Sequence, residues 1–248
     1  MRLSIFEIKI ILKHSKYIFG EYSKTYLFGS RLSDNLKGGD IDLYIKPEII
    51  NNLHLQKIEF LTLVEKDLGE QKIDVIFEKD KNRAIELMAI KNGVELNIDE
   101  VRLKKYISEC DKHLQRMEEA FDDMKNILPL NSQKYLTLEK DIVQDIDQYI
   151  FRFSKLQDTL GDKIFKLILK KYEDENYVMP FIDLLNKLEK YELIASSKEW
   201  IYLRRLRNEI SHQYDDEPEE MSQAINNFIS QKDVIKNIFI NIKNKVLI

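Results

Sequence analysis

The spacing of apolar residues predicts a mixture of helices and strands in the first part of the chain. Over residues 3–19, apolar side chains recur among charged ones with the period of an amphipathic helix. Short apolar runs and two more helical patterns follow, so the first part combines strands, turns and helices. We expect strands over 25–28, 40–45 and 72–77, and helices over about 53–68 and 81–92.

Strict alternation in the second of these strands separates carboxylates from apolar side chains. Asp40 and Asp42 lie on one face and the apolar residues between and after them on the other, because successive side chains of a strand point to opposite faces. The apolar face must be the buried one. Asp74 alternates with apolar neighbours in the next strand in the same way, so we expect all three carboxylates to point away from the core.

From Asp99 onward the apolar spacing is helical almost to the end of the chain. Asp99 is a good N-cap, and six of the seven glycines precede residue 98, which concentrates turns in the first part. We therefore expect an α+β fold with two domains, residues 1–98 and 99–248, the second being a five-helix bundle. Its expected helices run over about 99–127, 132–172, 180–193, 197–214 and 219–245.

Composition and charge exclude several classes of protein. Lys and Arg number 39 against 43 Asp and Glu, a formal charge of −4, which argues against binding nucleic acid by bulk positive charge alone. The single Cys110 excludes an intramolecular disulfide and indicates a reducing compartment. No stretch approaches the roughly 20 apolar residues of a membrane span. We therefore expect a cytoplasmic protein that has neither a membrane nor DNA as a partner.

A Gly-Ser turn and three aspartates form the first candidate site. A strand that ends in Gly29 and Ser30 and turns into a helix offers backbone N–H groups and a hydroxyl to a phosphate group. Asp40 and Asp42, with Asp74 on a neighbouring strand, form an oxygen cluster suited to Mg²⁺ and to substrate phosphates. Together these residues indicate phosphoryl or nucleotidyl transfer. The alternative is a solvated strand face beside an ordinary turn, the usual meaning of an isolated Asp-x-Asp.

At these residues the chain resembles the minimal nucleotidyltransferases of the DNA polymerase β-like superfamily. Their motif is Gly-Ser, nine or ten residues, Asp-x-Asp and a later Asp, and nine residues separate Ser30 from Asp40 here. The resemblance implies a small mixed sheet, ATP as the substrate and Mg²⁺ as the cofactor. It implies that Asp40 and Asp42 bind the metal, and that Asp74 helps to hold it and to activate the acceptor.

The same resemblance gives roles to the turn. It implies that Gly29 and Ser30 contact the triphosphate of the nucleotide. Arg31 follows directly and is close enough in sequence to assist as a nucleotide-binding residue. The alternative for Arg31 is an ordinary surface cation.

The second candidate site lies near the end of the fourth expected helix. At about 100° per residue, Arg207 and Tyr214 are nearly superposed two turns apart. Asn208 and His212 stack one turn apart on an adjacent strip. An imidazole that moves a proton and a guanidinium that binds a phosphodiester form a credible RNA-cleaving pair without a metal. The alternative is a helix-end histidine that favours the helix dipole, with Arg207 paired to an acid such as Asp215.

Arg, four residues, His, one residue and Tyr is the signature of HEPN domains, specifically of the toxins that pair with minimal nucleotidyltransferases, and the chain resembles them here. The resemblance implies that Arg207, Asn208 and His212 cleave RNA. It implies that Tyr214 is the tyrosine that the nucleotidyltransferase adenylylates to silence the nuclease, and that the helical domain forms a homodimer. In that family the two domains are usually on separate chains, whereas here they are fused, which puts a simple toxin–antitoxin cycle in doubt.

Three functions follow from these patterns. The leading one is Mg²⁺-dependent transfer of AMP from ATP to Tyr214, in its own chain or in the partner subunit, which controls a ribonuclease centred on Arg207 and His212. The second keeps the nucleotidyltransferase but gives the nucleotide to a small molecule such as an aminoglycoside, and it does not explain the motif from Arg207 to Tyr214. The third is a non-catalytic regulator that binds nucleotide or RNA.

Overall fold

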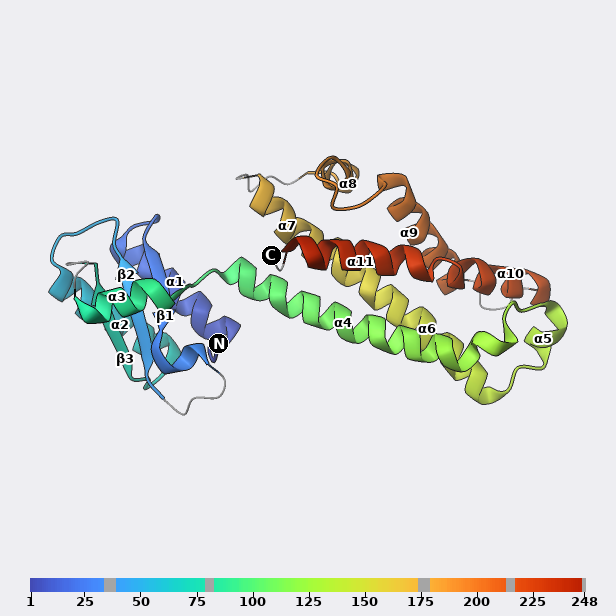
Figure 1. Cartoon of the computed structure of the whole chain (residues 1–248), viewed down its shortest axis with the longest axis horizontal. Coiled ribbons are helices and arrows are strands. Elements are labelled where there is room, and N and C mark those ends of the chain that lie inside the picture. The colour runs from blue at the N-terminus through green and yellow to red at the C-terminus, as the bar shows by residue number, and fades with distance from the viewer. Residues whose placement is uncertain (34–38, 79–82, 174–178, 213–216, 247–248) are drawn as a thin grey trace. The chain divides into compact units, whose positions relative to one another are not determined.

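The chain divides into two compact units, Met1–Arg102 and Leu103–Ile248 (Figure 1). The division follows Arg102 rather than residue 98, because Ile98 and Val101 pack against the core of the first unit. The structure is a computed structural model, and the residues that it describes are 1–33, 39–78, 83–173, 179–212 and 217–246, without the side chains of Ser211 and His212.

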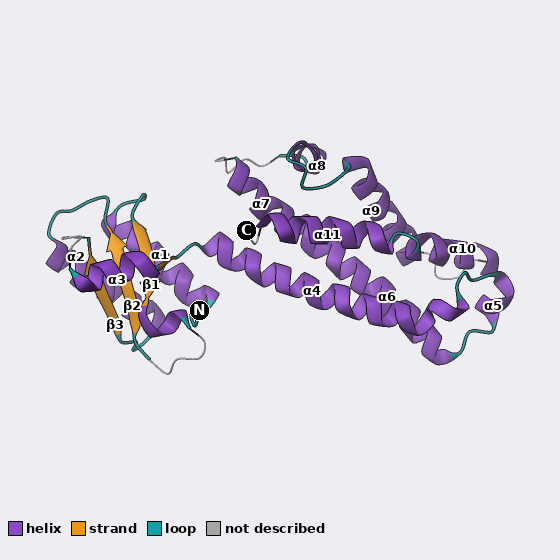
Figure 2. Cartoon of the chain, viewed as in Figure 1, coloured by secondary structure: helices purple, strands orange, loops and turns teal. Residues whose placement is uncertain are grey.

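A mixed sheet forms the centre of the first unit and confirms the expected α+β class (Figure 2). Its strands are β1 (Lys24–Phe28), β2 (Ile41–Lys46), β3 (Ile73–Phe77) and β4 (Val94–Glu95). Their order is β3-β2-β1-β4, with β1 antiparallel to β2 and to β4, and β2 parallel to β3. The apolar pattern predicts β1, β2 and β3 but not β4, because a strand of two residues is too short to show alternation.

Helices cover the apolar face of this sheet, as the alternation predicts. α1 (Ile5–Phe19) and α2 (Leu53–Leu68) pack against the apolar side chains of β2 in one core. The opposite face carries Asp42 and Tyr44. α3 (Ala84–Asn92) packs on Tyr44, which is fully buried, whereas Asp42 stays half-buried. The carboxylates therefore lie on the sheet face that α1 and α2 do not cover.

The second unit is helical over the residues that are described. Aromatic rings pair in its core, with centroids 4.4 Å apart for Phe153 and Phe228 and 4.5 Å apart for Phe165 and Trp200. In the described part of the chain, no helix combines the length and the apolar character needed to cross a bilayer. The second unit contains most of α4 (Ile98–Met124) and the helices α5 (Ser132–Leu136), α6 (Lys140–Asp158), the π-helix η3 (Thr159–Ile164), α7 (Phe165–Tyr172), α8 (Phe181–Lys190), α9 (Ser197–His212), α10 (Pro218–Ile229) and α11 (Lys232–Val246).

Two helices that the sequence pattern predicts as continuous are interrupted, so the expectation of five helices is wrong. The pattern over 132–172 is broken between α5 and α6, where Thr137 is the C-cap residue of α5. The pattern over 219–245 is broken between α10 and α11, where Ser230 is the C-cap residue of α10. Apolar side chains stay periodic across both breaks, so their spacing does not reveal them.

Candidate functional site

The register of the sheet brings Asp42 and Asp74 to neighbouring positions. The two residues are direct partners in the parallel pairing of β2 with β3. In the antiparallel pairing of β1 with β2, Asp42 is the partner of Phe28, the last residue of β1. The turn η1 (Gly29–Leu32), which contains the Gly-Ser pair, follows Phe28 directly. The structure therefore brings the turn and these two carboxylates together.

Gly29 lies against the carboxylate of Asp42. Its φ is +74°, in the left-handed region that side chains rarely adopt. A Cβ atom on Gly29 would lie 2.1 Å from Oδ2 and 2.9 Å from Cγ of Asp42. The backbone conformation therefore favours glycine at this position, and a larger residue would also displace the Asp42 carboxylate.

Burial and neighbouring charges shape the electrostatics of Asp42. Burial, followed by the negative charges of Asp74 and Asp40, raises the pKa of the Asp42 carboxyl, and the positive charge of Lys72 opposes this effect. Burial and like charges both disfavour the ionised carboxylate. A bound cation would relieve both costs, so the cluster is suited to one.

Asp40 is turned toward a lysine that the motif does not predict. Asp40 precedes β2 by one residue, and its Oδ2 accepts a hydrogen bond from Nζ of Lys72 in an ion pair. Lys72 precedes β3 by one residue, and its carbonyl oxygen accepts a hydrogen bond of 2.9 Å from the backbone N–H of Ile41. The position of Lys72, a basic residue directly before the strand that carries Asp74, is the sequence signal that could have identified it.

The carboxylates suit Mg²⁺ in charge and in ligand type, although the three of them are not gathered into one metal site. Among the described residues, no three potential ligand side chains gather closely enough to hold one ion. Asp42 and Asp74 are neighbours, whereas Asp40 is paired with Lys72. Mg²⁺ is usually held by one or two carboxylates together with substrate phosphates and water. Asp42 and Asp74 could therefore hold the ion with a triphosphate, and Asp40 could join after leaving Lys72.

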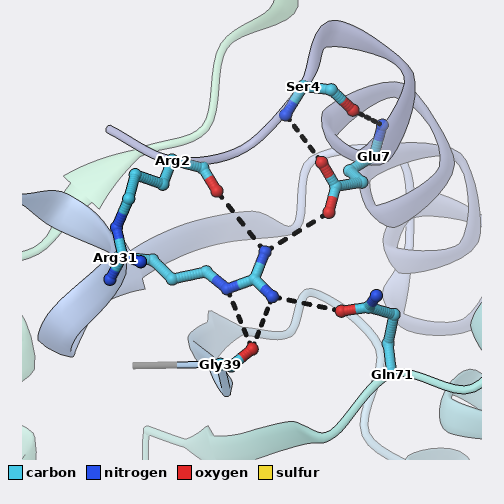
Figure 3. A network of polar contacts seen from close by, with 6 residues as sticks. All are labelled: Arg2, Ser4, Glu7, Arg31, Gly39 and Gln71. Carbon is cyan, nitrogen blue, oxygen red and sulfur yellow. Dashed lines mark hydrogen bonds and ion pairs between the residues drawn. The ribbon is translucent and has the colours of Figure 1, made fainter. Parts of the chain in front are cut away.

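Arg31 ties together the segments around the site. Its Nε donates a hydrogen bond of 3.1 Å to the carbonyl oxygen of Gly39, and Nη2 donates to the same oxygen (Figure 3). The guanidinium also donates to Oε1 of Glu7 at 3.3 Å, to the carbonyl oxygen of Arg2 at 3.4 Å and to Oε1 of Gln71 at 3.1 Å. The Arg31 side chain is only 13% exposed. It therefore joins the N-terminal segment, α1 and the approaches to β2 and β3.

This network gives Arg31 a structural task. Through Gly39 it sets the position of the next residue, Asp40. Ser30 belongs to the same region, because its carbonyl oxygen accepts a hydrogen bond of 3.0 Å from Nη2 of Arg2. A contact between Arg31 and a nucleotide stays a prediction.

In the second unit, α9 places Arg207 beside Asp158 at the end of α6. Nη2 of Arg207 lies 3.4 Å from Oδ1 of Asp158. Arg207 is half-buried and its neighbour Asn208 is exposed. The acidic partner suggested by the sequence, Asp215, lies outside the described residues.

Arg207 and Asp158 line a groove of about 780 Å³. This volume lies in the range of small-molecule and nucleotide sites. Lys155 adds a second cation, and the rest of the lining is largely apolar and aromatic, from α5, α6, α9 and α10. Phe151 of α6 is an exposed aromatic residue of this lining.

The remaining residues of this motif are only partly placed. His212 is the last residue of α9, and its side chain is outside the described part of the structure. Tyr214 lies outside the described residues altogether. The structure therefore places Arg207 and Asn208 on one helix but does not position the imidazole or the phenol.

Comparison of the chain with protein-family models, with curated protein sequences and with solved structures gave no match.

Proposed function

We propose that the first unit is a nucleotidyltransferase that transfers AMP from ATP to a hydroxyl group. The observation that carries the proposal is the pairing of Asp42 with Asp74 on parallel strands, with the Gly29 turn in contact with Asp42. This arrangement joins a backbone turn suited to phosphate oxygens with carboxylates suited to their counter-ion.

The chemistry divides among these residues. Backbone N–H groups at Gly29 and Ser30 bind the triphosphate, and Asp40, Asp42 and Asp74 hold Mg²⁺. The acceptor oxygen forms a bond to the α-phosphorus as the bond from that phosphorus to pyrophosphate breaks, and the proton of the hydroxyl passes to a carboxylate, Asp74 by its place in the motif. Bound Mg²⁺ would supply charge neutralisation on the phosphates.

We also propose that the second unit is a ribonuclease, with Tyr214 as the acceptor that the first unit adenylylates. The supporting observation is the half-buried Arg207, adjacent to Asn208 on α9 and lining a groove large enough for a nucleotide. Arg207 binds the phosphodiester of RNA, and His212 moves the proton without a metal. A homodimer through this unit would bring two such motifs together.

One experiment tests the transfer reaction. The purified protein is incubated with ATP and Mg²⁺, and its mass is measured on the intact chain and on peptides. We expect one or more AMP groups at Tyr214, and none in Asp42→Asn or in Tyr214→Phe. An unmodified wild-type protein would overturn protein adenylylation. In that case, AMP transfer to an aminoglycoside would establish the small-molecule alternative, and ATP binding without turnover, together with intact RNA, would establish the regulator.

A second experiment tests the nuclease and its control. Cleavage of total RNA is compared for the unmodified and the adenylylated protein, and for Arg207→Ala. We expect cleavage by the unmodified protein alone. Equal cleavage by the adenylylated and unmodified forms would contradict silencing, and equal cleavage by Arg207→Ala would contradict the nuclease assignment.

A further inference from the structure

The position of Lys72 is fixed by the backbone beside the carboxylates. The hydrogen bond from the N–H of Ile41 to the Lys72 carbonyl oxygen extends the parallel pairing of β2 and β3 by one step. Lys72 therefore begins its side chain next to Asp40, and Nζ reaches the Asp40 carboxylate. A cation of the protein itself thus sits at the end of the aspartate cluster.

The charge of Lys72 acts on the whole cluster. The hydrogen bond and the charge of Asp40, followed by the charges of Asp74 and Asp42, raise the pKa of Lys72. In return, the ammonium group partly offsets the repulsion that Asp42 experiences. Lys72 thereby supplies part of the neutralisation that a metal ion would supply.

Among the described residues near the site, the cations Arg31 and Lys72 differ in their freedom to move. The Arg31 side chain is 13% exposed and is held by several protein oxygens. The Lys72 side chain is 70% exposed, on a flexible stem, and its partner Asp40 is 41% exposed. Breaking an exposed ion pair of this kind costs little, because such pairs contribute little to stability. Lys72 is therefore the cation that can leave.

We propose that Lys72 neutralises the aspartates in the nucleotide-free protein and moves to the triphosphate when the metal and ATP bind. The first half of this proposal concerns the free protein, whereas the second half rests on the proposed nucleotidyl transfer. In this exchange the metal replaces Lys72 at Asp40, and the released ammonium meets the negative charge of the phosphates. Lys72 also lowers metal affinity when no nucleotide is present.

The proposal predicts that Lys72→Gln strengthens metal binding in the free protein but weakens the binding of ATP. In the nucleotide-free protein, Lys72→Gln removes the competing charge, so Mn²⁺, used as the probe ion, binds about threefold to tenfold more tightly, as one unit charge a few ångströms away in an aqueous setting implies. Binding is followed by electron paramagnetic resonance of free Mn²⁺. In the transfer reaction the same variant lacks a triphosphate ligand, so its KM for ATP rises about tenfold or more.

The matched control is Lys9→Gln, an equal change of charge at an exposed position of α1, which covers the opposite face of the sheet. It should leave both Mn²⁺ binding and KM unchanged. Lys72→Arg keeps the charge and should retain the Mn²⁺ affinity of the wild type.

Each arm has a result that overturns its half of the proposal. Unchanged or weaker Mn²⁺ binding by Lys72→Gln, or absence of Mn²⁺ binding in both proteins, overturns the neutralising role. Tighter Mn²⁺ binding with an unchanged KM overturns the move to the triphosphate. A wild-type protein that binds Mn²⁺ but transfers no nucleotide overturns the proposed function and with it the second half, while the Mn²⁺ comparison still decides the first.

Discussion

Gly29 and Asp42 are so close that a methyl group on the glycine would lie 2.1 Å from a carboxylate oxygen of the aspartate. The turn and the carboxylate are therefore in direct contact, and a side chain at Gly29 would displace the Asp42 carboxylate. This contact ties the part of the motif suited to phosphate to the part suited to metal.

Gly29→Ala should therefore combine strain with a displaced carboxylate. We expect a loss of about 1–3 kcal/mol in the free energy of unfolding, from the left-handed backbone and the clash, and a fall in transfer rate of about 100-fold or more. Thermal unfolding and AMP incorporation measure the two effects.

Substitutions at two other glycines separate the effect of backbone strain from the effect of the displaced carboxylate. Gly69 has a φ of +79° with no atom within 4 Å of an added Cβ, and Gly39 has neither a positive φ nor a neighbour within that distance. Gly69→Ala should reduce stability without reducing the transfer rate, and Gly39→Ala should change neither. A Gly29→Ala protein as active as Gly69→Ala would contradict the role assigned to the turn.

Arg31→Met should loosen the approach to β2. The substitution keeps much of the stem but removes the donors to Gly39, Glu7 and Gln71. Gly39 and Gln71 are exposed and Glu7 is half-buried, so water can replace the lost donors, and we expect a cost of about 1–2 kcal/mol in the stability of the first unit. Gln71→Ala removes a single bond of this network and should cost about 1 kcal/mol or less. Chemical denaturation measures both. A loss of activity in Arg31→Met without a loss of stability would favour direct contact with the nucleotide.

The raised pKa of Asp42 predicts that its replacement by a neutral residue increases stability while it abolishes transfer. Its carboxyl loses the proton at a higher pH in the folded chain than in the unfolded chain, so the contribution of Asp42 to stability falls as pH rises from about 4 through the raised pKa. At pH 7, Asp42→Asn should therefore unfold at a higher temperature than the wild type, while transferring no AMP.

Asp67 provides a control, because its pKa is shifted in the opposite direction. Hydrogen bonds from His14 and Lys13 lower its pKa, so its contribution is present at neutral pH and is lost as pH falls through the lowered value. Asp67→Asn should lower the unfolding temperature at pH 7. A change of the unfolding temperature in the same direction for Asp42→Asn and Asp67→Asn would contradict this account of the aspartate cluster.

Asp158→Asn should weaken RNA cleavage by releasing Arg207. The ion pair holds the guanidinium at the groove, so its loss should reduce cleavage about fivefold to tenfold, less than Arg207→Ala does. Glu209→Gln makes the same change in an exposed pair with Arg205 on the same helix and should leave cleavage unchanged. Equal effects of the two neutral variants would show that the pair with Asp158 has no special role.

Base stacking offers a separate test of the groove. Phe151 is 51% exposed, lines the groove and lies near the cation of Lys155. If RNA occupies the groove, Phe151→Ala should weaken RNA binding by about tenfold, the order expected for loss of one base–aromatic contact. Filter binding with the His212→Ala protein as background measures it without cleavage and keeps Arg207. Unchanged affinity would place the RNA elsewhere.

The sequence predicts the local parts of the first site better than its assembly. Alternation around Asp42 and Asp74 reveals which face each occupies, because side-chain direction in a strand has a period of two. It does not reveal the register that makes the two residues direct partners. Arg31 and Lys72 are missed in their observed roles for a similar reason: their partners are distant in the chain, and a lone cation carries no periodic signal.

The second unit shows the same limit in its helices. Apolar spacing finds α4, α8 and α9 within a few residues, but it misses the breaks at Thr137 and Ser230, because the apolar pattern remains periodic across each break. The pairing of Arg207 with Asp158 joins two helices far apart in the sequence, which spacing within one helix does not predict.

The parallel pairing of β2 with β3 has a consequence for how this chain tolerates changes of length. A shift of β3 by one residue would turn Asp74 into the apolar core and present Ile73 or Val75 to the carboxylate face. Gln71 and Lys72 are anchored by Arg31 and Ile41, so an added or deleted residue must be absorbed before Gln71. An insertion at Gly69, whose surroundings are open, should fold normally, whereas one after Lys72 should abolish the site.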